Sequence, residues 1–290
     1  MSVPGAGAAE PGANGVRAAE HGANEVRAAE HGALEVRAVG RWFAQPDGEA
    51  LRALEDVSFR VGASEFVTLV GPSGCGKSTL LRMAAGFDAP DAGELRLDGR
   101  PIGAPGADRG VVFQQPQLYP WLTVEENVCF GPRMRGLARA AYVPAAADYL
   151  RAVGLSGFER HYPYQLSGGM RQRLQIARVL INEPRVLLMD EPFGALDYQT
   201  RLAMQRLLLE LAAQYRPTVL FITHDIEEAI FLGTRVIVMS ARPGRIKADI
   251  PIRLPHPRSY KIKTTPEFVA LKERLVEEIR AEALKVATHA

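Results

Sequence analysis

From residue 33 onward, short apolar runs rich in β-branched residues alternate with stretches whose apolar positions recur at helical spacing. Apolar runs of about four to eight residues bounded by turn residues are typical of strands, and their alternation with helices is typical of a layered α/β domain. The sequence therefore predicts an α/β fold. The predicted strands cover residues 34–39, 57–61, 65–70, 186–190, 218–223 and 235–240.

The strand pattern stops between Gln114 and Gln175, where helical patterns dominate. Because strands resume after this stretch, we expect a helical insertion at about residues 115–175 within the α/β core. The first predicted strand of the chain begins at residue 34, so the core is expected to start near residue 32. It is expected to end near residue 257, before the basic segment.

Residues 258–290 are expected to form a basic segment followed by a helix that docks on the domain body. The helix is predicted to begin at Pro266 with Thr265 as its N-cap, since these residue types favour those positions. For the basic residues before it, a solvated strand is preferred over a site for anionic lipid or nucleic acid. The apolar face of the helix consists of Phe268, Leu271, Leu275 and Ile279, and the basic residues are Arg253, Arg258, Lys261 and Lys263.

The first thirty residues contain a ten-residue tandem repeat, "GANGVRAAEH", "GANEVRAAEH" and "GALEVRAVGR". Their Ala, Gly and Glu content offers little apolar surface to offset the entropy of ordering, so residues 1–31 are predicted to be a disordered leader. The leader lacks the basic and apolar regions of an export signal.

Composition narrows the class of protein. With 47% hydrophobic residues, the 290-residue chain can bury a large core, and its net charge of +2 argues against a nucleic-acid partner. Cys75 and Cys129 make no disulfide framework. No stretch approaches the roughly 18 apolar residues of a membrane span. We therefore expect a cytoplasmic protein that reaches a membrane only through a partner.

The segment "GPSGCGKST", Gly71–Thr79, follows a predicted strand and opens a predicted helix. It fits the spacing G-x-x-x-x-G-K-[ST], in which glycines let backbone N–H groups converge on phosphate oxygens. Lys77 would neutralise the β- and γ-phosphates, and the hydroxyl of Ser78 would bind Mg²⁺. The strand "VLLMDE" ends in two carboxylates: Asp190 would support the metal, and Glu191 would polarise an attacking water. The sequence thus predicts a nucleotide triphosphatase.

A second glycine segment, "QLSGGMRQR", lies before another predicted helix and lacks the Gly-Lys-Ser of the first. Ser167 followed by two glycines at a helix N-terminus offers free N–H groups to a phosphate. The plainer interpretation is a serine N-cap with glycine flexibility.

The whole set of motifs resembles the nucleotide-binding subunits of ATP-binding cassette (ABC) transporters over residues 33 to about 285. In the family's order stand the Walker A motif "GPSGCGKST", the Q-loop "VVFQQ", the signature motif "LSGGMRQR", the Walker B motif "VLLMDE", the D-loop "GALD" and the switch histidine in "ITHD". The resemblance implies a P-loop NTPase (RecA-like) core with an antiparallel β subdomain and a helical insertion subdomain. Met170 stands where the family usually has Gln in its signature motif.

In this family two cassettes face each other head to tail, and each ATP lies between one Walker A motif and the partner's signature motif. The resemblance therefore implies a homodimer in which the second glycine segment serves the partner's ATP. It also implies catalytic roles for Glu191, His224, Gln114 and Lys77, and Mg²⁺ binding by Ser78, Gln114 and Asp190. The implied nucleotide-binding residues are Phe43, Gly71, Pro72, Ser73, Gly74, Cys75, Gly76, Lys77, Ser78, Thr79, Asp190, Ser167, Gly168, Gly169 and Asp197.

The aromatic residue that stacks on adenine in this family corresponds to Phe43, with Trp42 as the alternative. A short permease helix is expected in a groove between the core and the insertion, lined by residues 115–123. Tyr119 and Trp121 would be its apolar contacts, although Trp121 fits the insertion's own core equally well.

Two longer stretches, "GAPGADRGVVFQQPQLYPWLTVEENVCFG" and "THDIEEAIFLGTRVIVMSARPGRI", are similar to importers of nitrate, sulfonates and taurine. The resemblance implies an ATPase subunit on the cytoplasmic face of the inner membrane, bound to a permease and indirectly served by an extracytoplasmic solute-binding protein. The alternative is an ABC-type ATPase that is not coupled to transport. Such proteins often carry fused cassettes, coiled-coil insertions or zinc cysteines, none of which the sequence contains.

Overall fold

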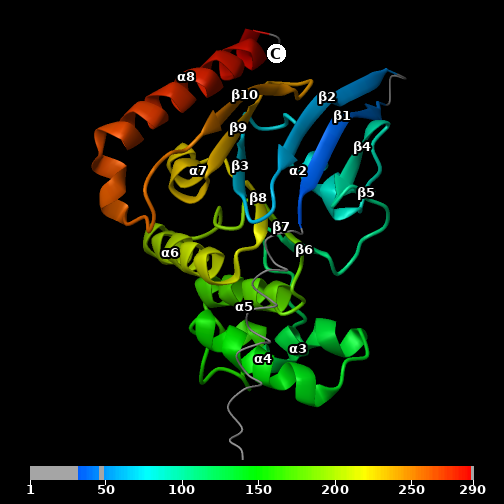
Figure 1. The fold of residues 1–290 in the computed structure, drawn as a ribbon, viewed down its shortest axis with the longest axis vertical. Helices are drawn as coiled ribbons and strands as arrows, with labels where there is room; N and C mark the ends of the chain where they lie inside the picture. Colours follow the sequence, from blue (N-terminus) through cyan, green and yellow to red (C-terminus); the bar gives the residue numbers. More distant parts are fainter. Residues whose placement is uncertain (1–31, 46–48, 289–290) are drawn as a thin grey trace, which may run out of the picture.

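The structure, a computed structural model, describes residues 32–45 and 49–288. The leader predicted at residues 1–31 lies outside the described residues. Two β-sheets form the upper part of the molecule in Figure 1, and a long C-terminal helix, α8 (Pro266–Thr288), lies along the upper edge. The lower part consists of three helices, α3 (Val124–Met134), α4 (Arg139–Ala152) and α5 (Gly168–Leu180). The expected α/β fold with a second, antiparallel sheet and a helical insertion is confirmed.

The larger sheet has six strands in the order β10-β9-β3-β8-β7-β6, and only β10 runs antiparallel to its neighbour. The central strands are apolar at nearly every position, as strands covered on both faces require. This pattern made four of the six strands predictable within a residue. The strands are β3 (Phe66–Val70), β6 (Arg109–Val112), β7 (Val186–Asp190), β8 (Thr218–Ile222), β9 (Arg235–Met239) and β10 (Ile246–Pro251).

The smaller sheet is antiparallel, in the order β2-β1-β4-β5. The predicted strands 34–39 and 57–61 are too short, because β1 continues to Ala44 and β2 begins at Ala50. The pairing of β1 with β2 shifts register around Ala38, whose φ is 47°, so the alternation of apolar and polar residues breaks there. The strands are β1 (Leu34–Ala44), β2 (Ala50–Val61), β4 (Ala92–Leu97) and β5 (Arg100–Pro101).

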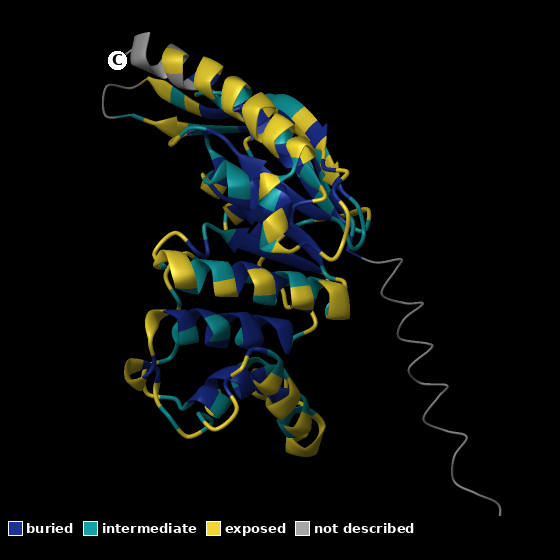
Figure 2. Ribbon diagram, turned by 90° about the vertical axis from the view of Figure 1, so that its left-hand side faces the viewer, coloured by how far each residue is buried: buried dark blue, intermediate teal, exposed yellow. Residues whose placement is uncertain are grey.

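Helices cover the larger sheet and build the insertion. Helix α2 (Lys77–Ala85) packs between the two sheets, whereas α6 (Tyr198–Tyr215) and α7 (Ile226–Leu232) lie on the opposite side of the larger sheet. Between β6 and β7 the chain forms α3 (Val124–Met134), α4 (Arg139–Ala152), the 3₁₀ turn η1 (Pro163–Gln165) and α5 (Gly168–Leu180). Buried positions concentrate in the central sheet and on α5, which links the insertion to the core (Figure 2).

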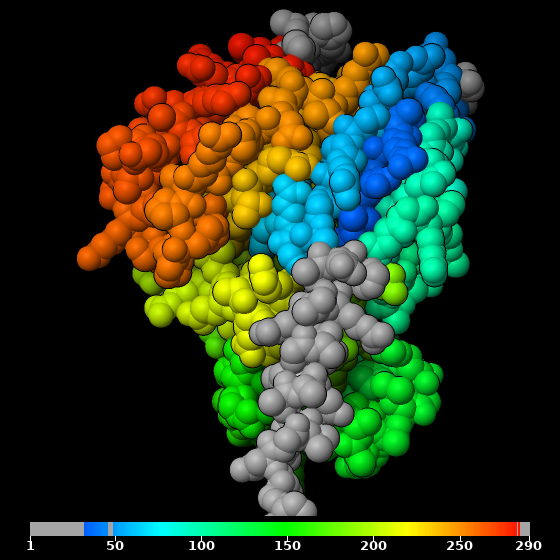
Figure 3. Space-filling model, viewed as in Figure 1, coloured from blue at the N-terminus to red at the C-terminus, as the bar shows by residue number. Residues whose placement is uncertain are grey.

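The C-terminal part consists of the 3₁₀ turn η2 (Tyr260–Thr264) and α8 (Pro266–Thr288), which runs along the outer surface (Figure 3). Phe268 and Leu275 are buried on the face toward the domain body. The expectation of a solvated basic segment is wrong for Arg258, which is 7% exposed and donates to three carbonyl oxygens at the end of α7. Within the described residues, no helix is long and apolar enough to cross a membrane.

Candidate functional site

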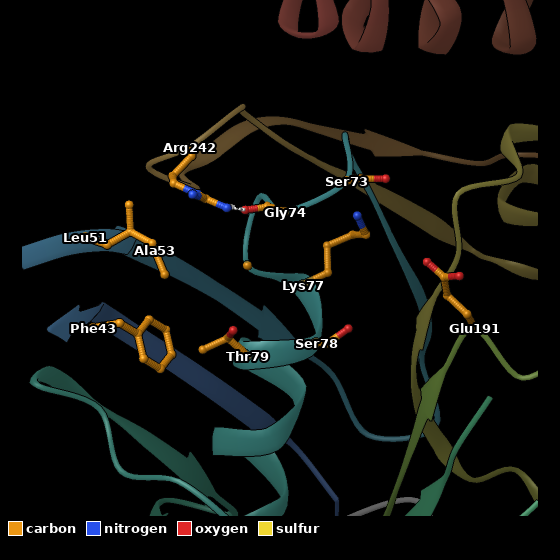
Figure 4. Close-up of a pocket in the computed structure, with 11 residues that line it drawn as sticks. Phe43, Leu51, Ala53, Ser73, Gly74, Lys77, Ser78, Thr79, Glu191 and Arg242 are labelled. Atoms are coloured by element: carbon orange, nitrogen blue, oxygen red, sulfur yellow. Dashed lines mark hydrogen bonds between the residues drawn. The ribbon is translucent and has the colours of Figure 1, made fainter. Parts of the chain in front are cut away.

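A cavity of about 360 Å³ lies where the two sheets and α2 meet (Figure 4). The loop between β3 and α2 forms one wall, and side chains from β1, β2, the end of β7 and the β9–β10 turn form the others. The site therefore gathers segments from almost the whole length of the core. Its lining residues are Phe43, Leu51, Ala53, Ser73, Gly74, Gly76, Lys77, Ser78, Thr79, Glu191 and Arg242.

The glycine loop has a backbone shape that only glycine tolerates at two positions. Gly74 and Gly76 have φ of 76° and 97°, in the left-handed region. A Cβ atom on Gly76 would also lie 2.5 Å from Cδ2 of Leu54 on β2. Helix α2 follows at once, and no side chain caps its N-terminus. Its first N–H groups are therefore available to an anion.

Lys77 is only 7% exposed, and its ammonium donates to the carbonyl oxygens of Gly71 (2.9 Å) and Pro72 (3.0 Å). These two acceptors are neutral, so a phosphate oxygen would make a stronger, charge-assisted bond with the same group. The Cys75 side chain is buried beneath the loop, and burial raises the pKa of its thiol. Cys75 thus fills space, whereas Lys77 holds a positive charge at the base of the loop.

An oxygen pair lies beside this charge. The Ser78 hydroxyl donates to Oδ1 of Asp190 at 3.1 Å, across the gap between α2 and β7. Burial raises the pKa of the Asp190 carboxyl, and the hydrogen bond from Ser78 opposes that shift. A cation bound next to this carboxylate would offset the penalty of burying its charge.

Glu191 and His224 form a second pair of polar side chains next to Asp190. Glu191 follows β7 with a φ of 43°, and its Oε2 lies 3.1 Å from Nδ1 of His224, which follows β8. The Gln114 amide lies against the same turn, since its Nε2 is 3.1 Å from where a Cβ of Gly194 would stand. The structure therefore gathers the five polar residues expected around a γ-phosphate, Ser78, Gln114, Asp190, Glu191 and His224, at one end of the sheet.

A buried network that the sequence did not reveal supports the turn carrying His224. Glu228 is 4% exposed and accepts hydrogen bonds from the Thr223 hydroxyl (2.6 Å) and the Gln205 amide (2.8 Å). Burial raises the pKa of the Glu228 carboxyl, against these two bonds. The Tyr260 hydroxyl lies 3.2 Å from Oε1 of Gln205, so the C-terminal segment joins the network. The one feature of the sequence that singles out Glu228 is its position three residues after Asp225, which is the spacing between an N-cap residue and the N3 residue of a helix.

The signature residues lie elsewhere. Ser167 is the N-cap of α5 and accepts a hydrogen bond from the Met170 N–H at 3.3 Å. Gly168 is exposed, whereas a Cβ on Gly169 would lie 2.5 Å from Cγ2 of Thr200 on α6. None of Ser167, Gly168 and Gly169 lines the cavity at the glycine loop of the same chain.

Asp197 lies at the start of α6, next to this second glycine segment. It is exposed and caps α6 by accepting a hydrogen bond from the Thr200 N–H at 3.0 Å. Because Gly169 packs on Thr200, the N-termini of α5 and α6 are neighbours on the surface. The second glycine segment and Asp197 therefore form one exposed surface.

Of the two aromatic candidates for the base, Phe43 lines the cavity and Trp42 does not. Neighbouring residues of a strand point to opposite faces, and the Trp42 ring lies over Gly40 of the smaller sheet. Phe43 is 41% exposed, with the Arg41 guanidinium 5.1 Å from its ring centre. The exposed Phe43 ring is thus free to stack on a planar group.

A second cavity, of about 290 Å³, lies between β6 and the insertion. Tyr119, Phe130, Arg109, Arg135 and Arg178 are among its lining residues, and the Arg109 guanidinium is paired with Asp108 at 3.2 Å. Trp121 is 70% exposed and touches the Tyr119 ring at a centroid distance of 5.7 Å, so it does not fill the insertion's core. The cavity therefore offers aromatic surface and positive charge together.

Sequence reasoning missed Arg242 as a lining residue. It comes from the turn between β9 and β10, 168 residues from the glycine loop that it contacts. The signal was the turn sequence "ARPGRI" directly after an apolar strand, because a loop at the carboxyl end of a central strand is a common place for ligand-binding residues.

Comparison with known proteins gives consistent matches. A family model described as "ABC transporter" matches residues 54–194. The chain is 47% identical over 234 residues to the nitrate import ATP-binding protein NrtD of Synechocystis sp., covering 79% of this chain and 88% of that protein. It is 50% identical over 242 residues to the taurine import ATP-binding protein TauB of Burkholderia pseudomallei, covering 82% and 93%.

A solved structure is similar over most of the fold. The dimeric structure of MJ0796, a bacterial ABC transporter cassette, matches with a TM-score of 0.67 at 33% identity and covers 77% of this chain and all of that one. A post-hydrolysis structure of the same cassette, bound to ADP and Pi, matches with a TM-score of 0.66.

Proposed function

The chain belongs to the ATP-binding proteins of ABC transporters, a family of ATPases, and we propose that it hydrolyses ATP to drive a membrane importer of small anionic or zwitterionic solutes. The observation that carries the proposal is the cavity at the glycine loop, lined by the buried Lys77 together with Ser78 and Glu191. Ser78 is hydrogen-bonded to Asp190, and Glu191 lies within hydrogen-bond distance of His224. The solute class comes from the two relatives, whose names give nitrate and taurine.

In this proposal the glycine loop and Lys77 hold the β- and γ-phosphates, and the Phe43 ring stacks on adenine. Glu191 accepts the proton of the water that attacks the γ-phosphorus. His224 contacts the γ-phosphate and keeps the Glu191 carboxylate oriented through the 3.1 Å contact between them. Gln114, whose amide lies against the turn that follows Glu191, orients the water.

The residues present also fit Mg²⁺. Hydroxyl and carboxylate oxygens are the donors that Mg²⁺ prefers, and it binds through few protein groups together with phosphate oxygens. The Ser78 and Asp190 oxygens, 3.1 Å apart, are close enough to bind one small cation together. Gln114 is proposed as the third protein group at this cation. When bound, Mg²⁺ would neutralise charge on the β- and γ-phosphates.

Two copies of the chain are proposed to act head to tail. Ser167 and Gly168 are exposed and lie outside the cavity of their own chain, which supports this arrangement, and so does the similarity to a dimeric cassette. Each copy would close its signature residues and Asp197 over the partner's ATP. Hydrolysis would then be tied to dimer closure, which is the mechanical step passed to a permease.

The second cavity is the proposed docking groove for a short helix of that permease. Tyr119 and the exposed Trp121 offer apolar contacts, and Arg135 and Arg178 suit a carboxylate on the incoming helix. The protein would work on the cytoplasmic face of the inner membrane, attached through the permease. An extracytoplasmic solute-binding protein would act on it only indirectly.

The test is to recover the tagged protein from detergent-solubilised host membranes and identify what accompanies it. We expect a multi-span permease with the unaltered chain and much less of it with Trp121→Ala or Arg135→Glu. The matched control is Arg151→Ala, an exposed arginine on α4 that pairs with Asp148 and does not line the groove. Recovery of only ribosomal, DNA-repair or cluster-assembly proteins would leave the ATPase chemistry in place and move the protein to the class not coupled to transport.

A further inference from the structure

Arg242 lies at the edge of the nucleotide cavity, on the turn between β9 and β10 (Figure 4). Its Nε and one terminal nitrogen both donate to the carbonyl oxygen of Gly74, each at 3.3 Å. Both bonds are long for N–H···O contacts and their acceptor is neutral. The guanidinium thus lies against the glycine loop without a strong partner.

The turn that carries Arg242 packs against the glycine loop and β2. Gly244 pairs with Ala53 and Glu55 through two backbone hydrogen bonds, at 2.9 and 3.0 Å. A Cβ atom on Gly244 would lie 2.0 Å from the carbonyl oxygen of Cys75, so only glycine allows this close approach. The position of Arg242 beside the loop is therefore fixed by backbone packing.

The C-terminal helix holds the other side of the turn. The Ala241 N–H donates to Oε2 of Glu282 at 2.9 Å, and the Lys247 ammonium lies 3.2 Å from carboxylate oxygens of both Glu278 and Glu282. Glu282 is 2% exposed. The backbone of the turn is thus held from both sides, while the Arg242 side chain remains exposed.

The charges around the cavity favour an anion at Arg242. Lys77 and Arg242 are the two cations among the lining residues, and Glu191 is the one acid. In the described part of the chain, no carboxylate lies within 4 Å of the Arg242 guanidinium, whereas Arg245 on the same turn pairs with Glu55 at 2.8 Å. A phosphate oxygen would replace the Gly74 carbonyl with a charged acceptor that allows shorter, stronger bonds.

We propose that Arg242 binds ATP directly, through its phosphate chain, as a second cation that acts with Lys77. The proposal rests on the nucleotide site proposed above. It assigns to the β9–β10 turn, far from the glycine loop in sequence, a share of the binding energy for the nucleotide. Helix α8 then contributes to nucleotide affinity by holding that turn.

The experiment is calorimetric titration of the full chain with ATP, ADP and adenosine in EDTA, with adenosine measured by displacement. We expect Arg242→Gln to weaken ATP and ADP roughly tenfold, the usual size of one charge-assisted hydrogen bond, and to leave adenosine unchanged. Arg242→Lys should lose less, because it keeps the charge but not the planar fork. Arg245→Gln is the matched control, since it removes the same charge from the same turn outside the cavity.

Three outcomes would overturn the proposal: unchanged ATP and ADP affinities in Arg242→Gln, an equal loss for adenosine, or an equal loss in Arg245→Gln. An equal loss for adenosine would mean that Arg242 contacts the base or ribose rather than the phosphates. An equal loss in Arg245→Gln would mean that the effect comes from the positive charge of the surface and not from a direct contact. Lys77→Ala separates this failure from that of the site itself. If Lys77→Ala also bound ATP normally, the nucleotide site would be rejected rather than the role of Arg242.

Discussion

The two glycine segments, Gly71–Thr79 and Ser167–Gly169, both precede a helix N-terminus but differ in everything around them. The first is enclosed by four other parts of the chain, contains a buried lysine and faces a pair of carboxylates. The second is an exposed N-cap that packs on α6 and lines neither cavity. The first segment is thus supplied with charges by its own chain, whereas the second would need the proposed partner chain to complete a site.

In the proposed dimer, this difference explains how one chain would use two phosphate-binding segments. An exposed helix N-terminus attracts anions only weakly in water, because solvent screens its dipole. It becomes effective when a second surface excludes that water. We therefore expect variants of the first segment to abolish nucleotide binding, and variants of the second to leave binding intact but prevent association of two chains.

The largest effect is expected for Lys77→Ala. Removing the ammonium leaves the phosphates without their buried counter-charge, so ATP affinity should fall by roughly 100-fold or more. Calorimetric titration would measure the loss, and ATPase activity should drop to background. A thermal melt serves as the fold control. Retained affinity would contradict the assignment of the first segment.

Glu191→Gln should come next in size. The amide has nearly the same shape but cannot accept the proton of the attacking water, so hydrolysis should slow by roughly 100-fold to 10,000-fold. ATP should still bind, and the unhydrolysed nucleotide should hold two chains together. Size-exclusion chromatography with light scattering, with and without ATP, would detect the dimer.

The control for this variant is Glu191→Gln combined with Lys77→Ala, which should remain monomeric because it binds no ATP. If Glu191→Gln alone failed to dimerise with ATP, Glu191 would lose its assignment as the residue that polarises water. The different roles of the two glycine segments would then have to be tested with variants of the second segment alone.

Gly168→Asp tests the second segment without disturbing the fold. Nothing lies within 4 Å of a Cβ added at Gly168, and an acidic side chain at the first position of a helix is favourable. The new carboxylate would repel a phosphate. ATP affinity of the single chain should be unchanged, whereas ATP-dependent dimerisation in the Glu191→Gln background should be lost.

Mixing chains sharpens this test. A Lys77→Ala chain keeps its signature segment and a Gly168→Asp chain keeps its glycine loop, so a mixed pair in the Glu191→Gln background has one intact composite site. We expect ATP to produce a heterodimer from this mixture and from neither variant alone. If the Gly168→Asp chain dimerised by itself, the signature segment would not contact the partner's ATP.

The chemistry that could be predicted from the sequence is the chemistry carried by consecutive residues. Gly71–Thr79 and the pair Asp190–Glu191 each combine a buried strand with residues that directly follow it, so their places in the fold follow from local pattern. The same holds for the four central strands, which are apolar along their whole length.

The parts that could not be predicted depend on distant contacts. Arg242 reaches the cavity because Gly244 packs against Cys75, and the buried Glu228 depends on hydrogen bonds from Thr223 and from the distant Gln205. Strand β4 escaped prediction for a related reason. Its two buried leucines alternate with charged residues over six positions, and its pairing with β1 rather than a long apolar run defines it.

The smallest expected effects concern stability, where Asp190, which is hydrogen-bonded to Ser78 of the first segment, and Ser167 of the second segment should respond with opposite signs. At Asp190, burial raises the pKa, so the folded protein binds this proton more tightly than the unfolded chain does. The free energy of unfolding therefore falls as the pH rises from about 3.9, the ordinary Asp value, through the raised pKa. Asp190→Asn keeps an acceptor for Ser78 without the charge, so at neutral pH Tm should rise by roughly 2 °C.

Ser167→Ala removes an N-cap worth about 0.5–1 kcal/mol and should lower Tm by a similar amount. Calorimetric melts of the nucleotide-free protein would measure both. A lower Tm for Asp190→Asn would mean that the ionised carboxylate stabilises the nucleotide-free protein. The negative charge that the nucleotide site needs would then have no cost in stability.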